Sequence, residues 1–465
     1  MNEKKLMNRA ADNIRILAAS MVEKANSGHP GGAMGGADFV NVLFSEFLVY
    51  DPENPRWEGR DRFFLDPGHM SPMLYSTLAL TGKFTMEELA QFRQWGSPTP
   101  GHPEVDIMRG IENTSGPLGQ GHTFAVGAAI AAKFLKARLG HVMDQTIYAY
   151  ISDGGIQEEI SQGAGRLAGH LGLDNLIMFY DSNDIQLSTA TDAVTSEDVA
   201  KKYEAWHWKV ITIDGNDPDA IRTALTEAKA VTGQPTLIIG KTIMGKGARK
   251  ADDSSYERNC ATHGAPLGGD AYINTIKNLG GDPTNPFQIF PEVKELYAKR
   301  AEELKKIVAE KYAAKAEWTK ANPELAAKLE LWFSGKAPKV NWNVIEQKAG
   351  DATRSASAKV RCTGYRSRKH DRFFCRPVKF RQDRRFLEEN TCIHKRRLHR
   401  CISAGRCFRI NHGLLLPGYG TSRRCDCCMR YLLRILRLHE TRHTYGCLDG
   451  TSRQIHLDTR RIPCR

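Results

Sequence analysis

Two apolar runs separated by a glycine- and alanine-rich segment constrain the fold most strongly. Residues 147–151 and 176–180 have the length and composition of buried strands, and residues 157–171 between them are typical of a helix. The order strand, helix, strand predicts a parallel sheet, in which both strands end at the same edge. Asp153 follows the first run and Asn183 follows the second. Ligands of open α/β sheets bind at this edge, outside the carboxyl ends of the strands.

The polar residues after the two strands suit a divalent cation that holds a diphosphate. Asp153 and Asn183 are hard oxygen donors about one crossover connection apart, and magnesium prefers such donors. Gly154 and Gly155 allow the backbone to approach phosphates closely. Turns favour Asp, Asn and Gly even without a ligand, so an ordinary strand–helix–strand unit explains the same residues. The spacing alone leaves both interpretations open.

Further short motifs occur before and after this unit. They are residues 26–31 (NSGHPG), 68–71 (GHMS), 101–104 (GHPE), 116–121 (GPLGQG) and 262–268 (THGAPLG). Together with the acidic turn and the later Asn, these motifs resemble the thiamine-diphosphate motif and its surroundings in transketolase. The resemblance covers roughly residues 2–291, and several motifs in the right order are far more specific than any one alone.

The resemblance implies that the chain binds thiamine diphosphate through a metal ion. Asp153, Asn183 and the backbone oxygen of Ile185 would bind Mg²⁺ or Ca²⁺, with diphosphate oxygens and water completing the coordination shell. Asn183 would also count among the cofactor contacts. His69 would contact the diphosphate, and Gly154 would lie against it.

A glycine-rich loop leads into the helix expected at residues 125–137. By resemblance, Gly116, Pro117 and Leu118 of this loop contact the thiamine. Backbone N–H groups at such a junction also suit anions in general, and tight packing of small residues explains the same glycines. His122 and its two successors stand where the family more often has small or aliphatic residues, and we interpret this difference as packing variation.

Four histidines and one glutamate complete the implied site. By resemblance, the sugar channel would be lined by His29, His69, His102 and His263. Of these, His29, His102 and His263 would be catalytic, and His263 would also touch the cofactor. Imidazoles can donate to hydroxyls and relay protons near neutral pH. A histidine in a turn or loop is also common as a solvated residue, so these roles depend on the resemblance. Glu158 resembles a glutamate that faces its twin across a dimer interface.

The implied reaction moves a two-carbon ketol unit from a ketose phosphate to an aldose phosphate, as in the pentose phosphate pathway. The carbon chemistry belongs to the cofactor, and the protein supplies anchoring and electrostatics. The intact family is a homodimer whose second domain supplies the glutamate that activates the cofactor. The resemblance stops after residue 360, so we expect this chain alone to bind the cofactor weakly and to turn over poorly.

Two departures from the family lie beside the expected metal site. Ser152 and Asp184 replace glycines that are usual there. We expect the small serine to be tolerated and the aspartate to add a negative charge near an intact metal site.

Two other functions remain open. One is a non-catalytic diphosphate-binding half that pairs with a separate chain. The other is a relative of deoxyxylulose-phosphate synthase, which shares the cofactor motif. The loop around His102 and the motif at residues 262–268 favour transketolase.

The composition changes abruptly after residue 360. Residues 361–465 carry 26 Lys and Arg against 8 Asp and Glu, a net charge of +18, whereas the first 360 residues carry −5. Ten of the eleven cysteines also lie after residue 360. A zinc or nucleic-acid module, a natural basic tail and a slipped reading frame each explain this change. No pair of CxxC knuckles with zinc-finger spacing occurs, so we favour the frame slip, no nucleic-acid partner and a largely disordered tail.

We therefore expect an α/β fold with a parallel sheet and helices on both faces, the thiamine-diphosphate-binding fold, followed by the basic tail. The expected divisions are a cofactor-binding domain at 1–290, a helical linker at 291–340, the start of a pyrimidine-binding domain at 341–360 and the tail at 361–465. The sequence has no run of about 18 or more apolar residues and no secretory h-region near its start. We expect a cytoplasmic protein with no membrane partner.

Overall fold

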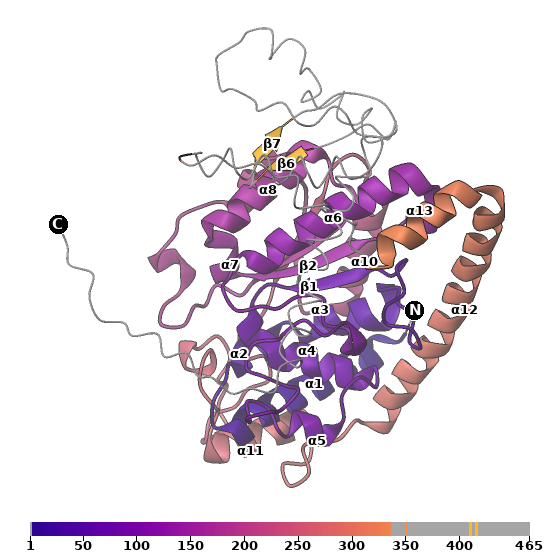
Figure 1. Ribbon diagram of the computed structural model, residues 1–465. Coiled ribbons are helices and arrows are strands. Elements are labelled where there is room, and N and C mark those ends of the chain that lie inside the picture. Colours follow the sequence, from indigo (N-terminus) through magenta and orange to yellow (C-terminus); the bar gives the residue numbers. More distant parts are fainter. Residues whose placement is uncertain (1, 336–349, 351–408, 412–413, 417–465) are drawn as a thin grey trace.

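A parallel sheet lies at the centre of the molecule (Figure 1). The computed structural model describes residues 2–335, 350, 409–411 and 414–416. The sheet has five strands in the order β1-β2-β3-β5-β4, and all neighbouring pairs are parallel. The strands are β1 (Arg62–Leu65), β2 (Ile147–Ser152), β3 (Leu176–Ser182), β4 (Lys209–Asp214) and β5 (Thr236–Lys241).

Helices cover both faces of this sheet (Figure 1). The first face is covered by α1 (Lys4–Ala25), α2 (Pro30–Gly35), α3 (Ala37–Val42), the π-helical η1 (Leu43–Phe47), α4 (Ser71–Leu80), α10 (Pro218–Ala230) and α11 (Gly269–Asn278). The second face is covered by α6 (Gln120–Leu139), α8 (Glu159–Leu171) and α9 (Val199–Ala205). The fold class expected from the sequence is confirmed.

The central strands are buried on both faces, which explains their continuous apolar runs. Along β2, Tyr148 and Tyr150 belong to the hydrophobic cluster of the first face. Ile147, Ala149 and Ile151 belong to the cluster of the second face. This alternation has the two-residue period of a pleated strand. A strand that is buried on both faces needs apolar residues at nearly every position, which is typical of parallel sheets covered on both sides.

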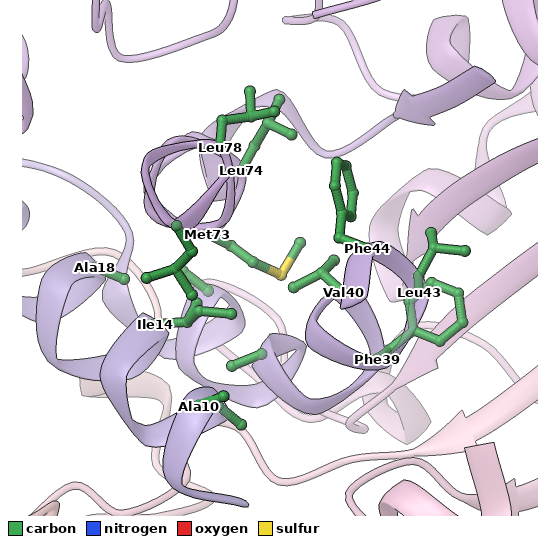
Figure 2. Close-up of a cluster of buried hydrophobic side chains, with 14 of the residues drawn as sticks. Ala10, Ile14, Ala18, Phe39, Val40, Leu43, Phe44, Met73, Leu74 and Leu78 are labelled. Carbon is green, nitrogen blue, oxygen red and sulfur yellow. The ribbon is translucent and has the colours of Figure 1, made fainter. Parts of the chain in front are cut away.

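Interlocking side chains of α1, α3 and α4 form the core of the first face. Figure 2 shows Ile14 of α1, Val40 of α3 and Met73 of α4 pointing toward one another. Phe39 stacks on Phe179 of β3 with 3.9 Å between ring centroids, which joins the helices to the sheet. Each such side chain contributes about 1.5–3 kcal/mol relative to an exposed one.

The helix predicted at residues 157–171 begins earlier and is interrupted. α7 (Asp153–Gln157) starts directly at the end of β2, and α8 follows after a break at Glu158. Glu158 has extended backbone angles, φ −63° and ψ 133°, and therefore ends one helix and precedes the next. The hydroxyl of Ser152 accepts from the backbone N–H of Gly155 and caps α7. Asp153 consequently lies in the first turn of a helix rather than in an open loop.

Thr85, with Glu88 three residues later, predicts a helix over residues 85–94 that opens with a capping box, and the observed helix is much shorter. α5 spans Met86–Leu89, and its capping box between Thr85 and Glu88 is present as predicted. Arg93 adopts φ +61°, which is incompatible with a continuing right-handed helix. Its backbone N–H donates to Thr99 O at 3.0 Å and closes a loop instead.

Two further helices follow the sheet domain. α12 (Pro291–Ala321) runs along one side of the molecule, and α13 (Pro323–Phe333) packs on the end of α6 (Figure 1). Two short strands, β6 (Arg409–Asn411) and β7 (Leu414–Leu416), pair antiparallel. Most of residues 341–360 and most of the tail lie outside the described part, so the start of the pyrimidine-binding domain, the disorder of the tail and the domain divisions remain predictions. No helix in the described ranges is long and apolar enough to cross a membrane.

Candidate active site

The ends of β2 and β3 meet directly through one buried carboxylate. Asp153 Oδ2 accepts from the backbone N–H of Asn183 at 3.1 Å and of Asp184 at 2.9 Å. The hydroxyl of Tyr180 donates to Asp153 Oδ1. Asp153 and Asn183 are only 3% and 4% exposed. The structure thus brings together the two turns that the sequence singled out.

The side chain of Asn183 is oriented by its neighbours. Its amide nitrogen donates to Asp181 Oδ1 at 3.3 Å, and its Oδ1 accepts from the backbone N–H of Ile185 at 3.1 Å. Asp181 is itself fixed by the hydroxyls of Tyr150 and Thr242. The amide oxygen therefore points toward the turn that carries Ile185.

The negative charge of Asp184 is partly balanced. Lys241 Nζ, at the end of β5, lies 3.3 Å from Asp184 Oδ1 and 2.8 Å from Ser182 Oγ. Asp184 has φ +64°, the left-handed conformation that favours glycine. The aspartate that replaces the family's usual glycine therefore keeps the glycine-like backbone of this turn.

The electrostatics around Asp153 fit a bound cation. Burial, together with the nearby carboxylates of Asp181 and Asp184, raises the pKa of Asp153 to about 7. A divalent cation would favour the ionised form and compensate this cost. The predicted donor set is one carboxylate, one amide and one backbone oxygen, all hard oxygen ligands. Over the described residues, no group of three or more His, Cys, Asp or Glu side chains is arranged for a metal, so this mixed set is the candidate.

Three histidines from distant segments converge near the turn that follows β3, because a Cβ added to Gly264, next to His263, would lie 2.7 Å from Leu187 Cδ1. His29 precedes α2, His69 lies in η2 (Gly68–Met70) and His263 follows η6 (Cys260–Thr262). The ring centroid of His29 lies 5.0 Å from that of His69 and 5.8 Å from that of His263. The rings of His69 and His263 are 5.6 Å apart. We call His29, His69 and His263 the histidine cluster.

The histidine cluster is neutral at pH 7. Burial, together with repulsion from His263 and His102, lowers the pKa of His29 to about 4 and the pKa of His69 to about 3. Burial also lowers the pKa of His263 and of the more exposed His102. Among the described residues, Nδ1 of His29 and Nδ1 of His263 are buried without a hydrogen-bond partner. These atoms are available to a polar ligand.

The glycine-rich loop packs against the start of α7. A Cβ added to Gly154 would lie 3.0 Å from Leu118 Cδ1, whereas a Cβ added to Gly116 would meet nothing within 4 Å. Gly68, next to His69, approaches the backbone of Gly116 so closely that an added Cβ would lie 3.0 Å from its nitrogen. Pro117 is exposed. The loop thus joins the segments of His69 and Asp153 and leaves an open surface at Gly116.

Sequence reasoning missed Asp66, which organises this loop. Its carboxylate accepts from the backbone N–H of Gly119 at 3.0 Å and of His122 at 3.2 Å, at the start of α6. Asp66 is 1% exposed, and burial raises its pKa to about 6. Its place between β1 and the GHMS motif was the available signal.

Glu158 lies on the surface between α7 and α8. It is exposed, and a Cβ added to Gly119 would lie 2.9 Å from Glu158 Cβ. Ile160 beside it is 48% exposed. The predicted role of Glu158 at a dimer interface remains a prediction.

Comparisons of the sequence with a family model and with curated proteins all indicate the same family. Residues 6–338 match the family model of the transketolase, thiamine diphosphate binding domain. Over 359 residues the chain is 42% identical to transketolase 2 of Escherichia coli strain K12, and this match covers 75% of the chain and 52% of that relative. It is 44% identical over 345 residues to transketolase 1 of Pasteurella multocida, and this match covers 72% of the chain and 50% of that relative. The chain spans about half the length of the curated relatives it matches.

Solved structures of the same family share the fold. The transketolase from Leishmania mexicana superposes with a TM-score of 0.72 at 35% identity, over 78% of this chain and 54% of that one. A transketolase from Pichia stipitis in complex with sedoheptulose 7-phosphate has a TM-score of 0.71, with the same identity and coverage. Variants of the latter protein were solved with xylulose 5-phosphate and fructose 6-phosphate.

Proposed function

This chain belongs to the transketolase family, and from that premise we propose that its described part is the thiamine-diphosphate-binding half of a ketol transferase. The observation that carries the proposal is the meeting of the Asp153 and Asn183 turns beside three neutral histidines. The proposed substrates are sugar phosphates, as in the Pichia stipitis complexes. We place the reaction in the pentose phosphate pathway of the cytoplasm.

In this proposal, the metal and the diphosphate are held at the carboxyl edge of the sheet. Asp153, the amide oxygen of Asn183 and the backbone oxygen of Ile185 would bind Mg²⁺. Gly154 and His69 would contact the diphosphate, since both lie beside the glycine-rich loop. The burial of the Asp153 carboxylate, which raises its pKa despite its hydrogen bonds, supports this role. When bound, thiamine diphosphate supplies the carbon nucleophile of the reaction.

The glycine-rich loop would hold the rings of the cofactor. Gly116, Pro117 and Leu118 would contact the thiamine, and the open surface at Gly116 supports this placement. Asp66 would keep the loop in position through its hydrogen bonds to the start of α6.

The histidines would bind the sugar hydroxyls and exchange protons with them. Because the pKa values of His29, His102 and His263 are lowered, each imidazole at pH 7 has one donor and one acceptor nitrogen. Such a group can orient a hydroxyl and take or return its proton when a neighbouring carbon–carbon bond breaks or forms. The unpartnered Nδ1 atoms of His29 and His263 support this role.

The proposed active unit is larger than the described part. We propose a homodimer in which Glu158 faces its twin, and a second domain that closes over the cofactor. The exposed neighbour Ile160 supports an interface here. The chain alone should therefore convert xylulose 5-phosphate and ribose 5-phosphate far more slowly than its full-length relatives, and rates like theirs would contradict this expectation.

The metal site gives the direct test. Thiamine diphosphate is titrated calorimetrically into the full chain with and without Mg²⁺, and Mg²⁺ should strengthen binding. Asp153→Asn should weaken the Mg²⁺-dependent binding at least about tenfold, because loss of a metal-site group commonly costs this much. Asp282→Asn, an exposed carboxylate before α12, is the matched control and should change nothing. Binding that is independent of Mg²⁺ and equal in both variants would refute the proposal.

A further inference from the structure

One buried carboxylate on the first face of the sheet joins four segments of the chain. Asp38 of α3 is 1% exposed. Its Oδ2 accepts from Arg15 Nη2 of α1, from Asn216 Nδ2 at 2.6 Å and from Lys246 Nζ at 3.2 Å. Asn216 follows β4, and Lys246 follows β5. We call these four residues the buried network.

Two members of the buried network also hold the end of α2, the helix that follows His29. Arg15 Nε donates to Met34 O at 3.0 Å, and Asn216 Nδ2 donates to Gly35 O at 2.9 Å. Both carbonyl groups belong to the last turn of α2, where a helix cannot supply its own donors. The network therefore fixes the end of α2 relative to α1 and to the end of β4.

α2 packs tightly against the segment at residues 243–247 and against Thr262. A Cβ added to Gly31 would lie 2.5 Å from Met244 Sδ and 2.6 Å from Thr262 O. Gly245 N donates to Gly31 O at 2.9 Å. Because a close-packed interior transmits strain, a displacement of α2 would also move the segments packed against it.

Two residues of the histidine cluster lie at the ends of this contact. His29 directly precedes α2, and His263 directly follows η6. Their ring centroids are 5.8 Å apart. Asn216 Oδ1 accepts from Ile243 N at 2.9 Å, so the buried network holds residues 243–247 as well as α2. The spacing of the two rings therefore depends on the network.

The hydrogen bonds of Asp38 are distributed unevenly. Its Oδ2 takes three donors, whereas its Oδ1 is buried and has no hydrogen-bond partner among the described residues. A bond to Oδ1 would lower the cost of burying this carboxylate. A buried ion pair is also weak evidence of a stabilising role, because apolar replacements are often neutral or stabilising. The arrangement suits the joining of segments better than it suits the stability of the carboxylate.

We propose that Asp38 is a positioning residue of the histidine cluster. Through its donors Arg15 and Asn216, it holds α2 and the segment after β5 in the arrangement that sets the spacing of His29 and His263. This inference deepens the proposed function and rests on it, because these histidines are the groups proposed to bind the sugar hydroxyls.

The experiment records the imidazole signals of the full chain by NMR, with histidine labelled with carbon-13. The variants His29→Gln and His263→Gln assign the two signals. Asp38→Asn keeps the size of the side chain and removes its charge. It should shift the signals of both cluster histidines, because their chemical shifts depend on the neighbouring rings. His122, on the second face of the sheet, should keep its signal.

Glu46→Gln tests whether any loss of a buried ion pair has the same effect. Glu46 pairs with Arg222, and their side chains are 11% and 5% exposed. Within the described residues, this pair bonds to Asn2 and not to α2. Glu46→Gln should lower the unfolding temperature, as Asp38→Asn should, but it should leave the signals of His29 and His263 unchanged.

Arg15→Lys separates charge from position. A lysine can keep the charge pair with Asp38, but its ammonium group lacks the planar fork that also reaches Met34 O. A positioning role predicts that Arg15→Lys shifts the signal of His29. A role in charge balance alone predicts the wild-type signal.

Three results would overturn the inference. In the first, Asp38→Asn unfolds at a lower temperature but keeps the wild-type signals of His29 and His263. In the second, Glu46→Gln shifts these signals equally, and in the third, Arg15→Lys leaves the signal of His29 unchanged. If Asp38→Asn does not fold, Arg15→Lys decides the question. The NMR experiment needs no ligand, whereas the proposed function is tested by Mg²⁺-dependent cofactor binding, so either can fail while the other stands.

Discussion

At the scale of single residues, several residues have an unfavourable backbone conformation or an unfavourably buried charge. Asp184 and Arg93 both have positive φ, and Asp153 is a carboxylate with almost no exposure. Asp153 and Asp184 lie at the carboxyl edge of the sheet, directly after the ends of β2 and β3. Strain and burial of this kind persist only where the surrounding structure holds them, and functional sites are the usual place.

Asp184 permits a clean test of its backbone conformation. Asp184→Gly and Asp184→Ala both remove the exposed ion pair with Lys241, which is worth at most about 1 kcal/mol. Only glycine adopts φ +64° without strain, so the glycine variant should be more stable than the alanine variant by about 1 kcal/mol. Thermal unfolding followed by circular dichroism measures the difference. Equal midpoints would mean that this turn has another conformation.

At the scale of elements, the start of α6 is held by contacts from two sides. Asp66 accepts from its backbone N–H groups, and His122 Nδ1 lies 2.6 Å from Ser161 Oγ on α8. His122 is completely buried, and burial lowers its pKa to about 3. The histidine that the sequence indicated as a packing variation therefore links two helices of the second face.

The buried histidine should make the fold sensitive to acid. Above pH 6.5 His122 is neutral in both the folded and the unfolded chain, so its contribution is fully present. Below pH 6.5 the unfolded chain takes up a proton that the folded chain does not bind until about pH 3. The free energy of unfolding should therefore fall by up to about 1.4 kcal/mol per pH unit from this group.

His122→Asn isolates this contribution, because an asparagine can keep the hydrogen bond to Ser161 without titrating. The variant should lose less stability than the wild type between pH 6.5 and 5, as followed by urea unfolding. His170→Asn on the exposed end of α8 is the control and should keep the wild-type slope. Identical slopes for all three proteins would count against the assignment.

At the scale of the whole molecule, the sheet and its two helical layers form one cooperative core. Phe39 connects the layers of the first face to β3 through its stacked contact with Phe179. Phe39→Ala should destabilise the protein by about 3–5 kcal/mol, because the cavity adds to the lost transfer energy. Met108→Ala, at a side chain that is 52% exposed, should stay within about 0.5 kcal/mol of the wild type. Thermal unfolding of both variants checks this contrast, and similar midpoints would argue against the packing described.

The sequence by itself determined the parallel sheet, the order of its elements and the two turns at Asp153 and Asn183. These features follow from local patterns, because apolar runs, caps and glycine motifs act over a few residues. Helix ends were less predictable. The break at Glu158 and the early end of α5 depend on backbone angles that the apolar pattern does not encode.

Only the tertiary structure decided which side chains share one site. His29, His69 and His263 come from segments far apart in the chain, and their convergence depends on how α2, η2 and η6 pack at one edge of the sheet. Asp66 has only one local signal, its position between β1 and the GHMS motif, because its role arises from backbone N–H groups of another segment. The role of a buried charged side chain can be inferred only when its surroundings are known. Its burial and its partners depend on tertiary packing and not on the spacing of residues in the sequence.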